Sequence, residues 1–177
     1  MDILVLQGSP NRDGSTALLV EEFMRGAREA GHNVERIDVA YADVAPCTGC
    51  LACGYEGTCA KSDGMDALRD KLLAADMLVF ATPLYYFNVS GQLKSFIDRF
   101  CAFSYSMRSR RRYAAFLSVA WNDDDWTFDA LDTYFTTLAR YLHLADRGRV
   151  MGGGCGTPSQ TARSRFPQAA YELGRSL

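Results

Sequence analysis

Four of the six cysteines in the chain lie in one short segment, PCTGCLACGYEGTC, at Cys47, Cys50, Cys53 and Cys59. The first three can direct their sulfurs at one centre from a single loop, and Cys59 can fold back to complete a shell of four thiolates. Such a shell suits an iron-sulfur cluster such as [4Fe-4S], or zinc. However, five residues precede the last cysteine where the bacterial iron-sulfur run has three, and the paired CxxC pattern of zinc sites is absent. A loop of free thiols is therefore the second interpretation, and Cys101 and Cys155 lie outside the run.

A second chemical candidate is the loop GSPNRDGST, which joins an apolar run to a predicted helix. It contains neither the GxGxxG fingerprint nor a P-loop lysine, so a dinucleotide site and a nucleoside triphosphate site are both unsupported. Its hydroxyls, its amide and the free N–H groups of a helix N-terminus can together hold a phosphate monoester. The side chains concerned are Ser9, Asn11, Ser15 and Thr16. The alternative is that Ser15 or Thr16 only caps the helix.

Three consecutive aromatic residues occupy a third loop, which runs from Thr82 to Asn88. Aromatic side chains in a loop are explained by a flat ring that stacks against them, or by a subunit interface. These two explanations are compatible. The candidate ring-binding residues are Pro83, Leu84, Tyr85, Tyr86, Phe87 and Asn88. Asn88 could instead serve only as the N-cap of the next helix.

The elements that must position these loops alternate between strands and helices. Apolar runs predict strands at 2–7, 34–39, 77–81 and 114–120 and, less clearly, a fifth strand that ends at 150–152. Helical periodicity predicts helices from 17 to 29, after an N-cap at Asp63, from about 90 to 103, and from Asp124 or Asp125 as N-cap to about Leu142. This alternation predicts an α/β fold, a flavodoxin-like doubly wound parallel sheet of five strands in the order 2-1-3-4-5. A ligand site is expected where the strand order reverses, between the loops that follow strands one and three.

Composition narrows the function classes. With 177 residues, 48% of them hydrophobic, the chain is expected to form a single domain over 1–177. Its 19 basic and 21 acidic side chains provide no footprint for nucleic acid or an anionic membrane, and no apolar run is long enough to span a membrane. The first residues lack the pattern of a signal peptide, so a cytoplasmic protein without structural disulfides is expected. The basic run Arg108, Arg110, Arg111 and Arg112 is expected to be a solvated turn, the alternative being a patch for a partner or a cofactor phosphate.

Taken together, GSPNRDGST, the CxxCxxC run with its trailing GTC, and TPLYYFNVSGQLKSFIDR resemble the flavodoxin-fold NAD(P)H-dependent FMN reductases, in particular their iron-sulfur flavoprotein branch. The resemblance covers most of residues 1–103. It implies non-covalently bound FMN, with its phosphate at Ser9, Asn11, Ser15 and Thr16 and its ring against residues 83–88. It also implies a homodimer or homotetramer. Two departures stand out: Phe87 replaces a glycine that is common in relatives, and the loop WNDDDW after strand four replaces a Gly-rich one.

The function expected from this resemblance is an NAD(P)H-dependent, FMN-containing oxidoreductase that passes electrons to a quinone, a flavin or a similar small-molecule acceptor. One alternative is an iron-sulfur flavoprotein with FMN and a [4Fe-4S] cluster, supplied with electrons by a ferredoxin. Another is a non-enzymatic carrier like flavodoxin, although the near-neutral charge argues against it. No catalytic acid or base is assigned, because the two histidines, His32 and His143, follow helix ends. The sequence does not specify the electron donor, the acceptor, or NADH over NADPH.

Overall fold

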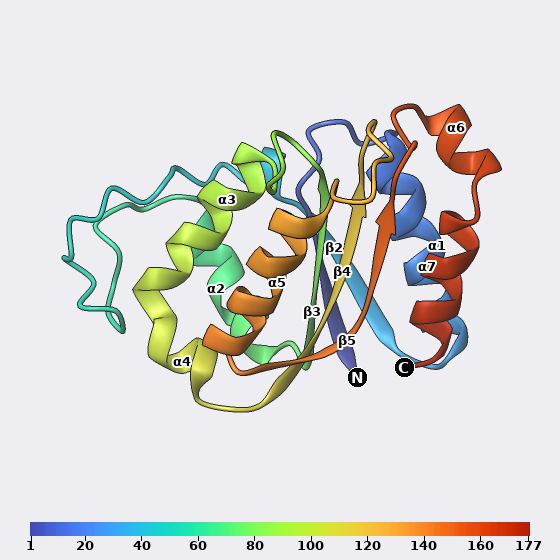
Figure 1. The fold of residues 1–177 in the computed structure, drawn as a ribbon. Helices are drawn as coiled ribbons and strands as arrows, with labels where there is room; N and C mark the ends of the chain where they lie inside the picture. Colours follow the sequence, from blue (N-terminus) through green and yellow to red (C-terminus); the bar gives the residue numbers. More distant parts are fainter.

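One fully parallel sheet of five strands organises the computed structural model, which describes residues 1–177 (Figure 1). The strand order is β2-β1-β3-β4-β5, so the predicted flavodoxin-like topology is confirmed. The strands are β1 (Asp2–Gln7), β2 (Asn33–Asp38), β3 (Met77–Pro83), β4 (Arg112–Val119) and β5 (Leu144–Gly152). The central strand β3 is buried along its whole length, as its continuous apolar run predicts for a strand covered on both faces.

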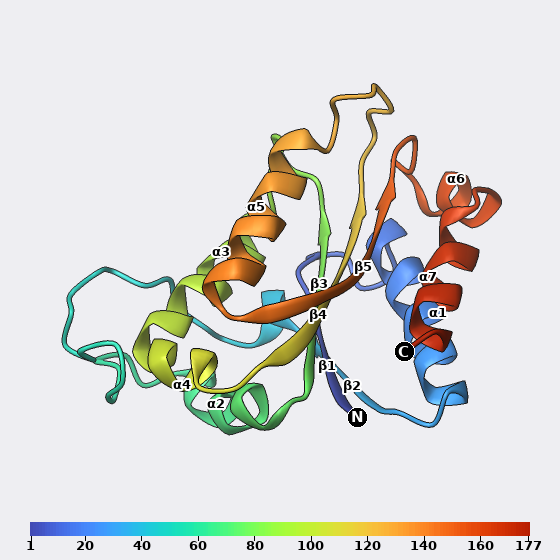
Figure 2. The same cartoon turned by 60° about the horizontal axis from the view of Figure 1, so that its bottom comes forward.

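Helices cover both faces of the sheet (Figures 1 and 2). They are α1 (Ser15–Glu29), α2 (Gly64–Ala74), α3 (Gly91–Asp98), α4 (Ser104–Arg108), α5 (Asp129–Tyr141), α6 (Pro158–Arg163) and α7 (Phe166–Arg175). Helices α1 and α7 lie side by side on one face, while α2, α3 and α5 cover the other. Successive side chains of β1 enter different cores, Val5 that of α1 and Leu6 that of α3, because a strand alternates its faces. No helix has both the length and the apolar character needed to cross a membrane.

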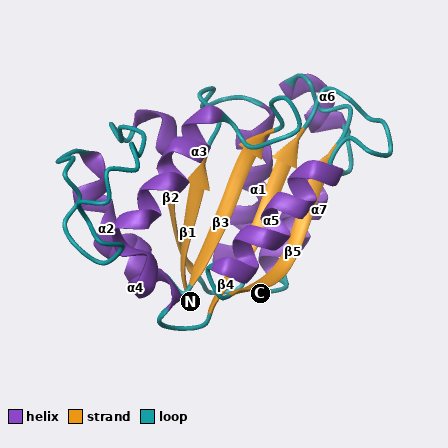
Figure 3. Ribbon diagram, turned by 60° about the vertical axis from the view of Figure 1, so that its left-hand side comes forward, coloured by secondary structure: helices purple, strands orange, loops and turns teal.

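All five strands point to the same edge of the sheet, whereas both chain termini lie at the opposite edge (Figure 3). The loops that follow β1, β3, β4 and β5 therefore meet at the carboxyl edge. The order of the strands reverses between β1 and β3, which is where an open α/β sheet forms its ligand crevice.

Ser90 fastens two of these loops together. It is fully buried and caps α3, accepting a hydrogen bond from the backbone N–H of Leu93. Its hydroxyl also donates to the carbonyl of Gly8 over 2.6 Å, and its own N–H donates to the hydroxyl of Thr82 over 2.9 Å. Gly8 approaches so closely that a Cβ there would lie 2.7 Å from Cβ of Leu93. The loop after β1 is thus anchored directly to β3 and α3, which flank the aromatic loop 82–88.

The structure corrects two expectations and extends a third. Helix α5 begins at Asp129, after Phe128 and without a side-chain cap, so neither Asp124 nor Asp125 is its N-cap. The basic run is not simply a solvated turn, because Arg112 is 2% exposed and donates to the carbonyl of Leu72 at the end of α2. Strand β5 ends at Gly152 as predicted, but it begins at Leu144, a start that the sequence did not indicate. Its first half is polar because it is an edge strand, paired only with β4, and this hides the apolar pattern.

The contact between α1 and α7 gives a stability prediction. A Cβ at Gly26 would lie 2.1 Å from the carbonyl oxygen of Tyr171, and one at Gly174 would lie 2.2 Å from that of Phe23. We expect Gly26→Ala and Gly174→Ala each to lower the free energy of unfolding by about 1–3 kcal/mol, because the helices must move apart. Urea unfolding measures this. Gly91→Ala is the matched control, since nothing lies within 4 Å of a Cβ there. If the Gly26 variant unfolds at the same urea concentration as the control, the close helix crossing is wrong.

Candidate functional site

The loop between β1 and α1 presents free polar groups at the N-terminus of α1. The N-cap of α1 is Gly14, which has no side chain to offer, so Ser15 and Thr16 are not the caps. The hydroxyl of Ser9 accepts from the N–H of Asn11 over 3.1 Å and shapes the turn. In contrast, the buried hydroxyl of Ser15 has no hydrogen-bond partner in the protein. A buried polar atom without a partner is costly, and a phosphate oxygen at this helix terminus would satisfy it.

A cleft of about 350 Å³ opens beside this loop at the carboxyl edge. One wall is formed by the predicted phosphate-binding residues, and the opposite wall by Pro83, Leu84 and Tyr85 after β3. The lining residues are Ser9, Asn11, Gly14, Ser15, Thr16, Pro83, Leu84, Tyr85, Val119, Ala120, Trp121, Cys155, Gly156 and Pro158. The structure therefore gathers seven of the ten predicted cofactor-binding residues around one cavity, polar on one side and apolar on the other.

Six lining residues come from parts of the chain for which the sequence predicts no site: Val119, Ala120, Trp121, Cys155, Gly156 and Pro158. Trp121 follows β4 and is 75% exposed, and its ring lies against Gly156, where a Cβ would be 2.1 Å from the indole. The position of Trp121 directly after a predicted strand is the signal that could have placed it here, since the carboxyl ends of parallel strands share an edge. No comparable signal marks the loop after β5, because that strand was recognised only at its end.

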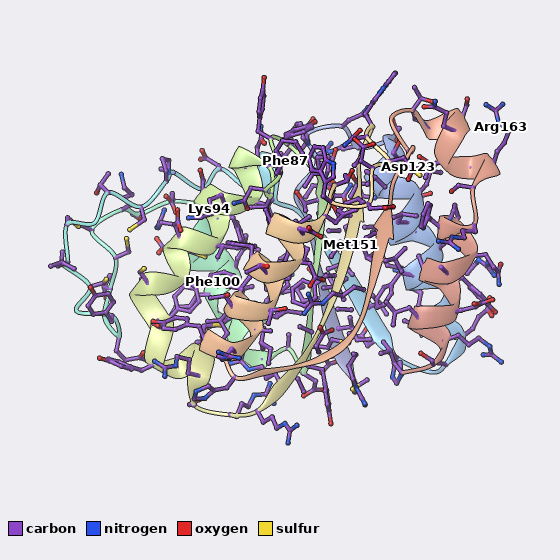
Figure 4. All side chains as sticks on the ribbon, viewed as in Figure 1. Phe87, Lys94, Phe100, Asp123, Met151 and Arg163 are labelled. Atoms are coloured by element: carbon purple, nitrogen blue, oxygen red, sulfur yellow. The ribbon has the colours of Figure 1, made fainter.

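Tyr86, Phe87 and Asn88 belong to a tight turn on the rim and not to the cleft lining. Tyr85 and Asn88 exchange two backbone hydrogen bonds, of 3.0 and 3.2 Å, and the two residues between them have positive φ values of 46° and 64°. Tyr86 is 99% exposed, whereas the ring of Phe87 lies 5.3 Å from that of Trp126. Phe87 and Asp123 both lie at the carboxyl edge (Figure 4). Positive φ is unfavourable for aromatic residues, so the turn is a strained feature held in place by its surroundings.

The cysteine loop forms a second cavity, of about 270 Å³. The segment projects beyond α3, away from the sheet (Figures 1 and 2). Cys47, Cys50, Cys53 and Cys59 all line the cavity, together with Cys101 and Arg99 from the end of α3 and the short 3-10 helix Arg99–Phe103. Cys101 was not predicted to belong here, because it lies more than forty residues along the chain from the run. Five of the six thiols therefore surround one space.

The sulfur atoms of these cysteines do not converge on one point. The N–H of Gly49 donates to the sulfur of Cys47, and the N–H of Lys61 to that of Cys59. Burial raises the pKa of the Cys101 thiol, and the nearby Cys47, Asp98 and Cys53 raise it further. All six cysteines are free, and no three His, Cys, Asp or Glu side chains converge closely enough to hold a metal ion. The donor set suits a soft metal or an iron-sulfur cluster, but the sulfurs would have to move inward to bind it.

The strand order defines a flavodoxin-like fold, with a cleft at the switch point that is lined by the N-terminus of α1, its unpaired hydroxyl and apolar residues after β3. The chain belongs to the NADPH-dependent FMN reductase family, whose model matches residues 1–140. The resemblance inferred from its three motifs is thus confirmed.

Relatives include an iron-sulfur flavoprotein of Methanocaldococcus jannaschii, which is 37% identical over 99 residues, or 56% of this chain and 51% of that protein. An iron-sulfur flavoprotein of Archaeoglobus fulgidus is 29% identical over 119 residues, or 67% of this chain and 54% of that protein. The chain spans about half the length of these curated relatives. Among solved structures, an NAD(P)H:quinone oxidoreductase from Methanothermobacter marburgensis has a TM-score of 0.76 at 20% identity, covering 99% of this chain and 95% of that one. This likeness supports the fold.

The aromatic turn yields a prediction that separates two adjacent tyrosines. Tyr85 lines the cleft, while Tyr86 is almost fully exposed. We expect Tyr85→Ala to weaken FMN binding by about 1–3 kcal/mol, the value of one lost stacking contact, and Tyr86→Ala to leave it nearly unchanged in the isolated chain. Titration of the apoprotein with FMN, followed by fluorescence quenching, measures both. Equal losses for the two variants would mean that the rim turn, and not the cleft wall, contacts the ring.

Proposed function

We propose that the protein binds FMN in the cleft at the carboxyl edge and uses it to pass electrons from NAD(P)H to a small-molecule acceptor such as a quinone or a flavin. The observation that carries this proposal is the buried, unpartnered hydroxyl of Ser15 at the N-terminus of α1, facing a cleft whose other wall is apolar. A phosphate monoester and a flat ring match these two walls. Membership of the NADPH-dependent FMN reductase family supports the same assignment.

In this proposal the phosphate is held by Ser9, Asn11, Ser15 and Thr16, together with the free N–H groups that begin α1. The ring lies against Pro83, Leu84 and Tyr85, with Trp121 closing the cleft from the next loop. Asn88 holds the rim turn through its amide oxygen, which accepts from the N–H of Val89 over 2.8 Å. The bound FMN supplies hydride and electron chemistry, and the protein orients it and excludes water from one side.

No protein acid or base is needed in this assignment, and neither histidine is placed to act as one. His32 contacts the amino group of Met1, and His143 contacts the carbonyl of Arg108. Neither residue lines the cleft. The protein's contribution is therefore binding and orientation, which is the usual division of labour with a flavin.

The rim of the cleft supports a homodimer or homotetramer as the assembly. Tyr86, Phe87, Trp121 and Trp126 are all more than 40% exposed, and they come from two neighbouring loops. Clustered exposed aromatic side chains are typical of surfaces that a partner covers. A second subunit on this rim would bury them and complete the wall above the ring.

A second candidate, an iron-sulfur flavoprotein that receives electrons from a partner such as a ferredoxin, is favoured by a different observation. Five thiols surround one cavity, and soft thiolates are the ligands that iron-sulfur clusters use. Several relatives carry the name iron-sulfur flavoprotein. In this candidate the [4Fe-4S] ligands are Cys47, Cys50, Cys53 and Cys59, and the flavin site is unchanged.

The flavin proposal predicts one FMN per chain and oxidation of NADH or NADPH in the presence of a quinone. Ser15→Asp with Thr16→Asp places negative charge at the phosphate position and is expected to abolish FMN uptake. The control is Ser109→Asp, an exposed serine at the other edge of the sheet, which should bind FMN normally. Absorbance of the purified protein and NAD(P)H consumption measure these outcomes. Unchanged FMN affinity in the double variant would refute the phosphate assignment.

The cysteine cavity predicts about four irons per chain in protein prepared without oxygen, if the second candidate is correct. Replacing Cys47, Cys50, Cys53 or Cys59 by serine should lose the iron and retain FMN, because the two cavities share no lining residue. Cys155→Ser is the control, since that thiol lines the other cleft. An iron assay and a flavin assay on the same samples separate the candidates. Iron-free wild-type protein with reactive thiols would leave only the plain FMN reductase.

A further inference from the structure

Arg99 is the most deeply buried cation in the cysteine cavity. It follows the last residue of α3, and its side chain is 1% exposed. One guanidinium nitrogen donates to Asp63 over 2.5 Å and to the carbonyl of Ala45 over 2.8 Å, and the other reaches the carbonyl of Lys61 at 3.5 Å. A buried charge is tolerated only when it is paired and hydrogen-bonded, and these contacts meet most of that requirement.

The acceptors of Arg99 lie on both sides of the cysteine run. Ala45 is two residues before Cys47, and Lys61 is two residues after Cys59. Asp63 adds to the closure, because its carboxylate also accepts from the N–H of Ala45 over 3.1 Å. One side chain from the 3-10 helix after α3 therefore joins the entrance and the exit of the loop. The planar guanidinium fork allows this because its donors are spread over three nitrogen atoms, whereas those of a lysine radiate from one.

One nitrogen atom of Arg99 has no partner. Its Nε atom is buried and has no partner in the protein, although the side chain lines the thiol cavity. A buried donor that makes no hydrogen bond costs about 1–3 kcal/mol. The presence of this donor therefore indicates that a bound group supplies its acceptor. The guanidinium also lies close to Cys59. A centre held by four thiolates carries net negative charge and has sulfur atoms that accept hydrogen bonds.

We propose that Arg99 is the positioning residue of the cysteine cavity, which ties the two ends of the loop together and supplies the buried positive charge and N–H donor for an anionic, sulfur-ligated metal centre. The first role, which we call the clasp, is to tie the two ends of the loop together, and it requires no metal. The second role, toward the metal centre, rests on the iron-sulfur candidate described above. Arg99 does not line the flavin cleft, so FMN binding is independent of it.

Three proteins besides the wild type test this proposal. Arg99→Met removes the charge and the donors, and Arg99→Lys keeps the charge without the fork. Arg110→Met is the matched control, because Arg110 also bonds backbone carbonyls, those of Ala74 and Ala75, and an aspartate, Asp76, but lines a different pocket. FMN content reports whether each variant is folded. Hydrogen-deuterium exchange of residues 46–61 is measured on metal-free protein. Iron content and midpoint potential are measured after anaerobic reconstitution with iron and sulfide.

In the Arg99→Met variant we expect loop exchange to be about tenfold faster and most of the iron to be lost, with FMN retained. Arg99→Lys should retain part of the iron at a lower midpoint potential, because a hydrogen bond to sulfur is missing. Arg110→Met should match the wild type in every measurement. If Arg99→Met fails to fold, Arg99→Lys and Asp63→Asn decide the question in the same assays.

Two results would overturn the proposal. Loop exchange and iron content in Arg99→Met equal to those of the wild type would refute the clasp. If Arg99→Lys shows faster loop exchange but the iron content and midpoint potential of the wild type, Arg99 only holds the loop together. That result would refute its role toward the metal centre. If the wild type itself takes up no iron, the iron-sulfur candidate and the role toward the centre both fall, while the exchange data still decide the clasp.

Discussion

The buried hydroxyl of Ser90 is the contact on which the flavin cleft depends. It donates to Gly8 in the first loop and accepts from Leu93 in α3, while the Ser90 N–H is held by Thr82 at the end of β3. Hydrogen bonds inside a protein are strong, and an unmade one is expensive, so this small network has essentially one arrangement. It joins the loop after β1 to the end of β3 and the start of α3. The switch point of the fold determines where a crevice can form, and Ser90 links the elements that border it.

Much of this architecture is predictable from the sequence, for physical reasons that particular residues illustrate. Strands buried on both faces are continuous apolar runs, and β1 and β3 were located that way. Asp63 was recognised as an N-cap, and its side chain does accept from the N–H of Met65. Edge strands and caps made by backbone alone carry weaker signals. The polar start of β5 and the uncapped start of α5 were missed for that reason, and helices α6 and α7 were not predicted at all.

The residues of the candidate sites also differ in how well the sequence predicts them. Residues that act through neighbours in sequence, such as Ser15 and Thr16 or the four-cysteine run, form patterns that can be read directly. Residues brought in by the fold do not. Cys101 and Arg99 enter the thiol cavity from α3 and the turn after it, and Trp121 enters the flavin cleft from the loop after β4. Tyr86 and Phe87 lie in a turn outside the cleft lining, which the sequence does not indicate because it does not report that two aromatic residues adopt positive φ.

The packing of α7 against α1 has a consequence for the order in which the molecule forms. The core under α1 includes Val150, Cys155 and Ala170, all of which follow the region matched by the family model. Helix α1, whose N-terminus borders the cleft, therefore lacks part of its cover until β5 and α7 have been synthesised. Contacts between residues so distant in sequence are slow to form, since loop closure must precede them. The N-terminus of α1 should hence reach its native packing only when α7 docks, and not when the loop after β1 itself emerges.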